Sequence, residues 1–191
     1  PYVIIKDKIS KFAQSINFLI KIKDKIYGYN TDVFGALETI KDKQKKNIVI
    51  FGFGGAGEAI FRCIYKLYPK SKFQVVSKKK NIGSFDKNRV KFIKKIDQDY
   101  LSKADLFINC SPLGSNLKKK FLKKTPLKKI HFQNINSNIL VFDIVYKPTK
   151  TLLSKLCKNF SIKYINGLKM NTVQAQKALS IIQKNYKIDA V

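Results

Sequence analysis

The stretch that most constrains the fold is IVIFGFGGAGEAIFRCIYKLY, residues 48 to 68. Its first four residues form a short, wholly apolar run of the kind that predicts a buried parallel strand. A glycine-rich turn follows at once, and the segment after it has apolar residues at helical spacing, which are Ala59, Ile60, Cys63, Ile64 and Leu67. A strand, a glycine turn and a helix in direct succession predict the first half of a βαβ unit.

The turn itself, GFGGAG, is a GxGxxG motif formed by Gly52, Gly54 and Gly57. In this context Gly52 permits the tight turn, Gly54 lets a pyrophosphate approach the backbone, and Gly57 lets the helix pack closely on the sheet. The backbone N–H groups at the helix start, including those of Gly55 and Ala56, then offer an anion site. No Gly-Lys-Ser/Thr follows the glycines, so the motif predicts a dinucleotide site and not an ATP phosphate loop.

The end of the next expected strand distinguishes between the two nicotinamide cofactors. An NAD site needs an acidic residue there for the ribose 2′-hydroxyl, whereas a 2′-phosphate needs positive charge. The sequence has Ser77, Lys78 and Lys79 at this place, and the nearest acid is Asp86. The missing carboxylate predicts NADP(H) more strongly than the lysines do, because lysines occur throughout this chain.

Downstream, apolar runs alternate with helical segments at the spacing of βαβ units. This order predicts an α/β fold with a Rossmann-like doubly wound parallel sheet. The expected strands are residues 73–77, 91–93, 104–111, 139–146 and 162–165, and the expected helices are residues 151–160 and 170–186.

The N-terminal part has a different pattern. Residues 16–22 and 25–30 read as two strands of a hairpin around Lys23 and Asp24. Three residues able to cap a helix, Asn30, Thr31 and Asp32, then precede a helical segment. One capping residue suffices, so the crowding suggests that another of the three serves a site.

Composition limits the function classes. The net charge of +27 suggests an anionic partner, but only two of 39 basic residues are arginine and the lysines are dispersed. We therefore interpret the charge as compositional drift and expect no nucleic-acid partner. No apolar run is long enough to cross a bilayer, so no membrane partner is expected either. Three separated cysteines indicate reduced thiols in a cytoplasmic protein, and no residue cluster suggests a metal.

Six segments, in order, resemble motifs of the shikimate dehydrogenase family. GYNTDVFG resembles the family's GxNTDxxG, FGFGGAGEAI its glycine turn, and VVSKKK the region that follows its second strand. NCSPLG is similar to its NxTPxG loop, DIVYKPTKTLL to its DxVYxPxxTxLL, and GLKMNTVQAQKAL to its GxxMLxxQAxxxF. The resemblance implies NADP-dependent, reversible reduction of 3-dehydroshikimate to shikimate in the chorismate pathway to aromatic amino acids.

The resemblance also implies residue roles. Asp32 would be one member of an acid/base pair with a lysine, and Asn17, Tyr146 and Gln174 would contact the substrate. Asn109 and Ser111 would line the cofactor's path, and Gly167 and Met170 would flank the nicotinamide. Ser77, Lys78 and Lys79 would hold the adenosine 2′-phosphate.

The partner lysine is not identified. The family carries it upstream in an NVTxPxK motif; Val3 stands at its place here, and no motif surrounds Lys6, Lys8 or Lys11. Because the chain also begins with Pro1, we expect an N-terminally truncated fragment, nearly inactive alone, as monomer or homodimer. The expected divisions are a remnant of the substrate-binding domain (1–31), a linking helix and linker (32–46), the NADP-binding domain (47–166) and a C-terminal helix (167–191).

Alternatives remain at this stage. The chain could act on quinate or another polyol acid, or it could be a cofactor-binding module without catalysis. A basic nucleic-acid-associated protein on a Rossmann scaffold is a third possibility. Residues 115–137, rich in lysine and asparagine, suggest a surface elaboration.

Overall fold

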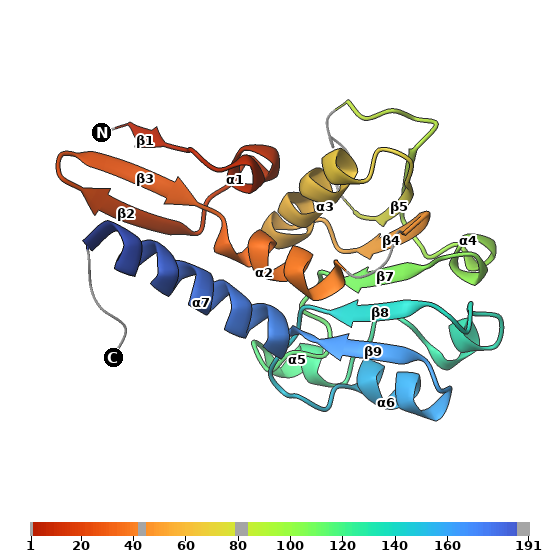
Figure 1. Ribbon diagram of the computed structural model, residues 1–191. Helices are drawn as coiled ribbons and strands as arrows, with labels where there is room; N and C mark the ends of the chain where they lie inside the picture. The colour runs from red at the N-terminus through yellow and green to blue at the C-terminus, as the bar shows by residue number, and fades with distance from the viewer. Residues whose placement is uncertain (1, 42–44, 79–83, 187–191) are drawn as a thin grey trace.

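Two separate sheets organise the chain, whose computed structural model describes residues 2–41, 45–78 and 84–186. A three-stranded sheet lies at the N-terminal side and a six-stranded sheet forms the larger part of the molecule (Figure 1). The last helix, α7 (Gly167–Tyr186), runs from the larger sheet back along α2 (Thr31–Ile40) toward the smaller one.

The six-stranded sheet is parallel throughout and has the order β6-β5-β4-β7-β8-β9. The order runs outward in both directions from β4, so the reversal lies between β4 and β7, where doubly wound sheets bind ligands. The predicted fold class is therefore confirmed. Its strands are β4 (Asn47–Phe51), β5 (Lys72–Val76), β6 (Val90–Ile93), β7 (Leu106–Asn109), β8 (Leu140–Asp143) and β9 (Lys163–Asn166).

Alternation along the strands builds a core on each face of this sheet. Ile48 and Ile50 belong to the core that includes residues of α2 and α3 (Gly55–Leu67). Val49, between them, belongs to the opposite core, which includes residues of α4 (Gln98–Ser102) and α6 (Leu152–Asn159). All three are fully buried, which explains why the strand reads as a continuous apolar run.

The lysine-rich stretch 115–137 contributes to the second core, so its prediction as a surface elaboration is wrong in part. Leu127 and Phe132 are buried there, and Phe132 stacks on Phe160. The stretch contains the short helix α5 (Lys119–Leu122) and the 3₁₀ helix η1 (Lys129–Phe132). Isolated apolar residues among lysines gave no periodic pattern from which this burial could be predicted.

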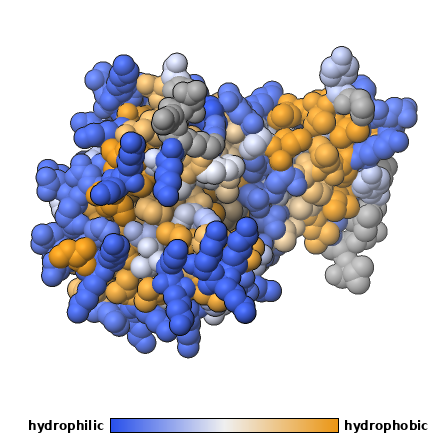
Figure 2. Space-filling model, turned by 180° about the vertical axis from the view of Figure 1, so that it is seen from behind, coloured by the Kyte–Doolittle hydropathy of each residue, from blue (hydrophilic) through white to orange (hydrophobic). Residues whose placement is uncertain are grey.

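The smaller sheet has the order β1-β3-β2. The predicted hairpin is present as β2 (Phe18–Ile22) and β3 (Lys25–Tyr29), while β1 (Val3–Ile4) adds a parallel strand that the sequence did not reveal. Helix α1 (Lys8–Ala13), also unpredicted, is capped by Asp7, whose carboxylate accepts from Ser10 N. Figure 2 shows apolar side chains gathered over this part of the molecule.

Helix α7 packs against α2 at a point where a side chain would not fit. A Cβ on Gly35 would lie 2.4 Å from the carbonyl oxygen of Met170. The helix begins three residues before the predicted start, and Asn166 Oδ1 accepts from Leu168 N in its first turn at 3.1 Å. At its far end, the Tyr186 hydroxyl donates to the Lys21 carbonyl and so ties the helix to β2.

Candidate functional site

The glycine turn has the two kinds of glycine that its motif predicts. Gly52 has a positive φ of 96°, and a Cβ there would lie 2.9 Å from Ser111 N. A Cβ on Gly57 would lie 2.2 Å from the Gly52 carbonyl oxygen. These two positions therefore bring β4, the start of α3 and the end of β7 into direct contact.

The other glycines of the turn face open space. Nothing lies within 4 Å of an ideal Cβ on Gly54 or Gly55. Both residues and Ala56 are exposed at the N-terminus of α3, where the first backbone N–H groups have no carbonyl partner within the helix. This arrangement fits a pyrophosphate, since an anion can approach the amides and the positive end of the helix without a steric barrier.

The expected adenosine end lies at the neighbouring strand. Ser77 directly follows β5 and donates its backbone N–H to the Ile93 carbonyl at 2.9 Å. Lys78 is exposed beside it, whereas Lys79 lies outside the described residues. Neither of these two described residues carries a carboxylate. A 2′-phosphate requires this absence, because a carboxylate would repel it.

A cavity of about 200 Å³ joins the glycine turn to the N-terminal residues. Gly55 and Ala56 of the turn line one side of it, and Asn17 and Asp32 line the other. Asp32 is half-buried in the first turn of α2, which is capped by Asn30 through a 2.9 Å bond to Val33 N. One of the three crowded residues is therefore the cap, and Asp32 is left to face the cavity.

Asp32 has a carboxyl group suited to proton exchange. Burial raises its pKa above the usual value, and a hydrogen bond from Asn17 opposes that shift. Among the described residues Asp32 forms no ion pair. Of the lysines near the N-terminus, Lys6 lies over the Tyr27 ring at 4.5 Å and Lys8 over the Phe12 ring at 5.4 Å.

Thr31 connects two of the expected substrate contacts. Its backbone N–H donates to Asn17 Oδ1 at 2.8 Å, and its hydroxyl donates to Gln174 Oε1 at 3.0 Å. Gln174 Nε2 in turn donates to Asn171 Oδ1 at 3.4 Å. Asn17, which directly precedes β2, and Gln174 of α7 thus meet at the first turn of α2, although 157 positions separate them in the sequence.

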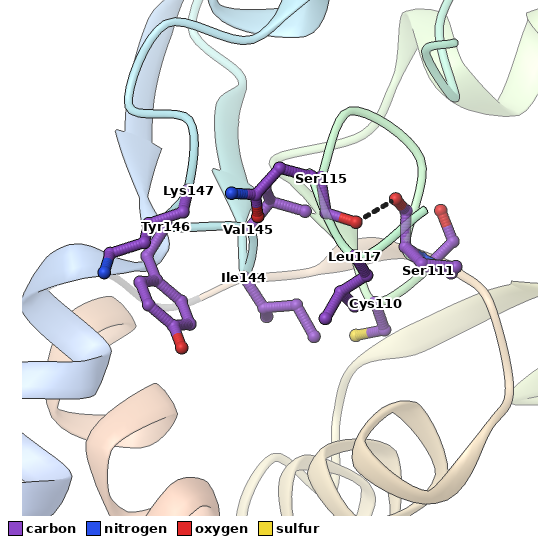
Figure 3. Close-up of a pocket in the computed structure, with 10 residues that line it drawn as sticks. Cys110, Ser111, Ser115, Leu117, Ile144, Val145, Tyr146 and Lys147 are labelled. Carbon is purple, nitrogen blue, oxygen red and sulfur yellow. Dashed lines mark hydrogen bonds between the residues drawn. The ribbon is translucent and has the colours of Figure 1, made fainter. Parts of the chain in front are cut away.

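A second cavity, of about 340 Å³, lies at the carboxyl ends of β7 and β8. Ser111 and Tyr146, predicted for cofactor and substrate, both line it. Figure 3 shows Tyr146, Ile144, Leu117 and Cys110 gathered around this space, with the Ser115 hydroxyl bonded to the Pro112 carbonyl beside it. The cavity adjoins the glycine turn, because a Cβ on Gly57 would touch Cys110 Cβ at 3.0 Å.

Three expected cofactor residues are buried and contribute mainly to the shape of the site. Asn109 is fully buried, and its Oδ1 accepts from the Ser111 hydroxyl at 2.7 Å and from the Ser111 N–H at 3.1 Å. Gly167 permits a close approach to β8, because a Cβ there would lie 2.1 Å from the Ile144 carbonyl oxygen. Met170 is 8% exposed and belongs to the core that includes α2.

Sequence reasoning missed four residues of these networks. Thr31 stood within the quoted GYNTDVFG, and Asp143 and Thr151 stood within DIVYKPTKTLL, but none was assigned a role. Tyr164 carried no sequence signal. All but Thr31 belong to one buried cluster, in which Asp143 Oδ1 accepts from Asn109 Nδ2 at 2.9 Å and Asp143 Oδ2 from the Tyr164 hydroxyl at 3.1 Å.

The described residues contain no group of His, Cys, Asp and Glu side chains placed to hold a metal ion. Within the same ranges, every helix is too short or too polar to cross a bilayer. All three cysteines are free and buried, and burial raises the pKa of Cys63 to about 12.

Comparisons with known proteins agree with the motif resemblance. The chain is 32% identical over 178 residues to the NADP(+) shikimate dehydrogenase of Clostridium botulinum, covering 87% of this chain and 64% of that protein. It therefore spans just under two thirds of this relative's length. No protein-family model matches the chain.

Solved structures give the same result. Shikimate dehydrogenase 1 from Peptoclostridium difficile superposes with a TM-score of 0.74 at 27% identity, covering 97% of this chain and 67% of that one. A shikimate dehydrogenase solved in complex with NADP+ superposes with a TM-score of 0.70 at 27% identity, covering 93% of this chain and 63% of that one.

Proposed function

Because this chain is homologous to the shikimate dehydrogenases along most of its length, we propose that it provides the NADP(H) site and part of the catalytic site for the reversible reduction of 3-dehydroshikimate to shikimate. The observation that carries the proposal is the cavity shared by the glycine turn and Asp32. A cofactor held on the turn and a carboxyl group able to exchange a proton then open onto one space.

The cofactor assignment depends on residues that fit its parts. The open N-terminus of α3 at Gly54, Gly55 and Ala56 would receive the pyrophosphate, while Ser77 and Lys78 would receive the 2′-phosphate. Ser111 would then line the nicotinamide end, and Gly167 would shape it by its close approach to the Ile144 backbone. When bound, NADPH supplies the hydride for the ketone.

Most substrate contacts would come from the residues around the first turn of α2, and Tyr146 would reach the substrate from the second cavity. Reduction of a ketone needs a proton donor at the carbonyl oxygen, and the reverse reaction needs a base there. Asp32, whose pKa is raised by burial, would be one member of the acid/base pair that exchanges this proton. Asn17, Gln174 and Tyr146 would hydrogen-bond the hydroxyl and carboxylate groups of the substrate.

We also propose the functional division expected above. Residues 1–31 would belong to the substrate side, 32–46 to the linking helix and linker, 47–166 to the cofactor side and 167–191 to the helix that returns to the substrate side. The partner would be a small molecule, without nucleic acid or membrane, in a cytoplasmic monomer or homodimer.

The cofactor preference is tested by fluorescence titration of the 191-residue chain with NADPH and NADH. We expect NADPH to bind more tightly, and Lys78→Ala to reduce the preference. Lys72→Ala is the matched control, since Lys72 is also exposed but lies at the opposite end of β5. Equal affinities for the two cofactors in the unmodified chain would overturn the 2′-phosphate assignment.

Turnover gives a second test. With Lys6 and Lys8 over aromatic rings and no ion pair to Asp32 in the described residues, we expect the chain alone to oxidise shikimate very slowly. Rapid NADPH formation with shikimate would show that another group in this chain completes the acid/base pair.

A further inference from the structure

Asp143 is a fully buried carboxyl group at the end of β8, and its described partners are all neutral. It accepts from Asn109 Nδ2 at 2.9 Å, from Val145 N at 3.1 Å and from the Tyr164 hydroxyl at 3.1 Å, with the Thr151 hydroxyl more distant at 3.5 Å. Burial raises its pKa to about 6 in spite of these bonds. Among the described residues no lysine or arginine forms an ion pair with it.

A buried charge without a cation is unfavourable for stability. A carboxylate loses most of its hydration on burial, and neutral donors restore only part of that free energy. An apolar residue at the end of this strand would match its neighbours, since Val141 and Phe142 are fully buried. Groups of this kind cluster at functional sites, where a local cost in stability is accepted.

The partners of Asp143 lead directly to the walls of the second cavity. Asn109 uses its NH₂ on Asp143 and its Oδ1 on Ser111, whose hydroxyl then accepts from Leu113 N at 3.3 Å. Ser111 lines the cavity on the β7 side. Val145, the residue between Ile144 and Tyr146, lines it on the β8 side and donates to the same Asp143 Oδ1.

The other oxygen of Asp143 reaches the elements behind the cavity. Tyr164 belongs to β9, and Thr151 is the N-cap of α6, where its hydroxyl accepts from Ser154 N at 3.1 Å. Thr151 also contacts the NCSPLG loop, because a Cβ on Gly114 would lie 3.3 Å from Thr151 Cβ. One carboxyl group thus connects β7, β8, β9 and α6.

We propose that Asp143 is a positioning residue, which holds the loops after β7 and β8 in the register that makes Ser111 and Tyr146 face one cavity. It acts through Asn109 and the Val145 backbone and does not touch the ligand. The proposal rests on the proposed function only in taking NADPH as the ligand of that cavity. The positioning itself can be measured without any ligand.

The ligand-free test is hydrogen–deuterium exchange of the 191-residue chain. In Asp143→Ala we expect the N–H groups of Ser111, Leu113 and Val145 to lose more protection than those of the central strand β4, whose exchange reports only the change in global stability. Asp143→Asn keeps an Oδ1 acceptor and should restore protection. An equal loss of protection at the three amides and in β4, or no change at the three amides, would overturn the proposal.

The ligand test is NADPH affinity by fluorescence. Because small displacements of positioning groups have large effects, Asp143→Ala should weaken binding by about tenfold or more, with most of the loss restored in Asp143→Asn. Asp105→Ala is the matched control: Asp105 accepts from the N–H groups of Lys46 and Asn47, both at 2.9 Å, at the opposite, amino end of the strands. If Asp105→Ala lost as much NADPH affinity as Asp143→Ala, the loss would be due to general destabilisation and the positioning role would be overturned.

Two further outcomes are distinguishable. Should Asp143→Ala fail to fold, Asn109→Ala breaks the same connection to Ser111 and should reproduce the faster exchange at Ser111 and Leu113 alone. If the unmodified chain does not bind NADPH, the proposed function fails, while the exchange experiment still decides the role of Asp143.

Discussion

Two carboxyl groups, those of Asp32 and Asp143, have raised pKa values but lie in different surroundings. Asp32 is half-buried, has one amide partner in Asn17 and faces a cavity that the turn also lines. Asp143 is fully buried and accepts from three neutral groups within 3.1 Å. An open carboxyl group can exchange a proton with a ligand, whereas an enclosed one can only organise the groups around it.

The largest expected difference is in stability. Asp143→Ala leaves the Asn109 amide, the Val145 N–H and the Tyr164 hydroxyl without acceptors, which should cost about 3 kcal/mol of unfolding free energy. Asp32→Ala, at a half-buried helix position, should cost about 1 kcal/mol or less. Urea denaturation of both variants measures the two values. Equal losses would contradict the distinction between an open and an enclosed group.

The next effect concerns how the open site is assembled. Gly35→Ala places a Cβ against the Met170 carbonyl and should destabilise the chain by about 2 kcal/mol, since backbone must move. The displacement of α7 should also remove the bond between Thr31 and Gln174. Gly54→Ala is the control, because nothing lies within 4 Å of that Cβ. A stability change in Gly54→Ala as large as in Gly35→Ala would exclude crowding as the cause.

The enclosed group should also give a dependence of stability on pH. Burial raises the pKa of Asp143 from 3.8 to about 6, so the folded state binds its proton more tightly than the unfolded state does. This contribution is complete below pH 3.8 and is lost as the pH rises through 6. Between pH 5 and 7.5 the loss is about 1.4 kcal/mol, taking 1.36 kcal/mol per pH unit.

Comparison with Asp143→Asn isolates that contribution. The variant should lose less stability than the unmodified chain over the same pH range, as followed by thermal or urea unfolding in matched buffers. Asp32 shifts in the same direction, but it is half-buried and remains in both proteins. A parallel pH dependence in the two proteins would mean that Asp143 is not the group that titrates.

Much of the larger sheet could be predicted because its information is local. The apolar run of β4, the glycine turn and the regular alternation of strands and helices each lie within a few adjacent residues. The two-residue strand β1 could not be predicted in this way, since its partner Ile26 is distant in sequence from Val3. Residues 139–146 were expected to be one strand, but β8 ends at Asp143, where the side chain takes up the Val145 N–H.

The site could be predicted only where a motif marked it. Asn17, Asp32 and Gln174 were named from motifs, and the structure brings Asn17 and Gln174 to the first turn of α2. The cluster around Asp143 includes Tyr164, whose position on β9 becomes relevant only once β8 and β9 pair. Hydrogen-bond networks between strands therefore remain hidden until the topology is known.

The smallest expected effect concerns the hydrogen bond between Thr31 of α2 and Gln174 of α7. Thr31→Val removes the hydroxyl that donates to Gln174 Oε1 at 3.0 Å and should cost about 1 kcal/mol. Thr39→Val is the matched control on the same helix, since within the described part of the chain the Thr39 hydroxyl bonds only to the Gly35 carbonyl of its own helix, at 2.8 Å.

A double-mutant cycle of Thr31→Val with Gln174→Leu should give a coupling of about 0.5 to 1 kcal/mol, because the two side chains are in direct contact. The cycle of Thr39→Val with Gln174→Leu should give a value near zero. Because Thr31 bonds to both Asn17 and Gln174, coupling confined to the first cycle would mean that Thr31 itself holds α7 to the first turn of α2. Equal coupling in both cycles would instead assign the effect to α2 as a whole.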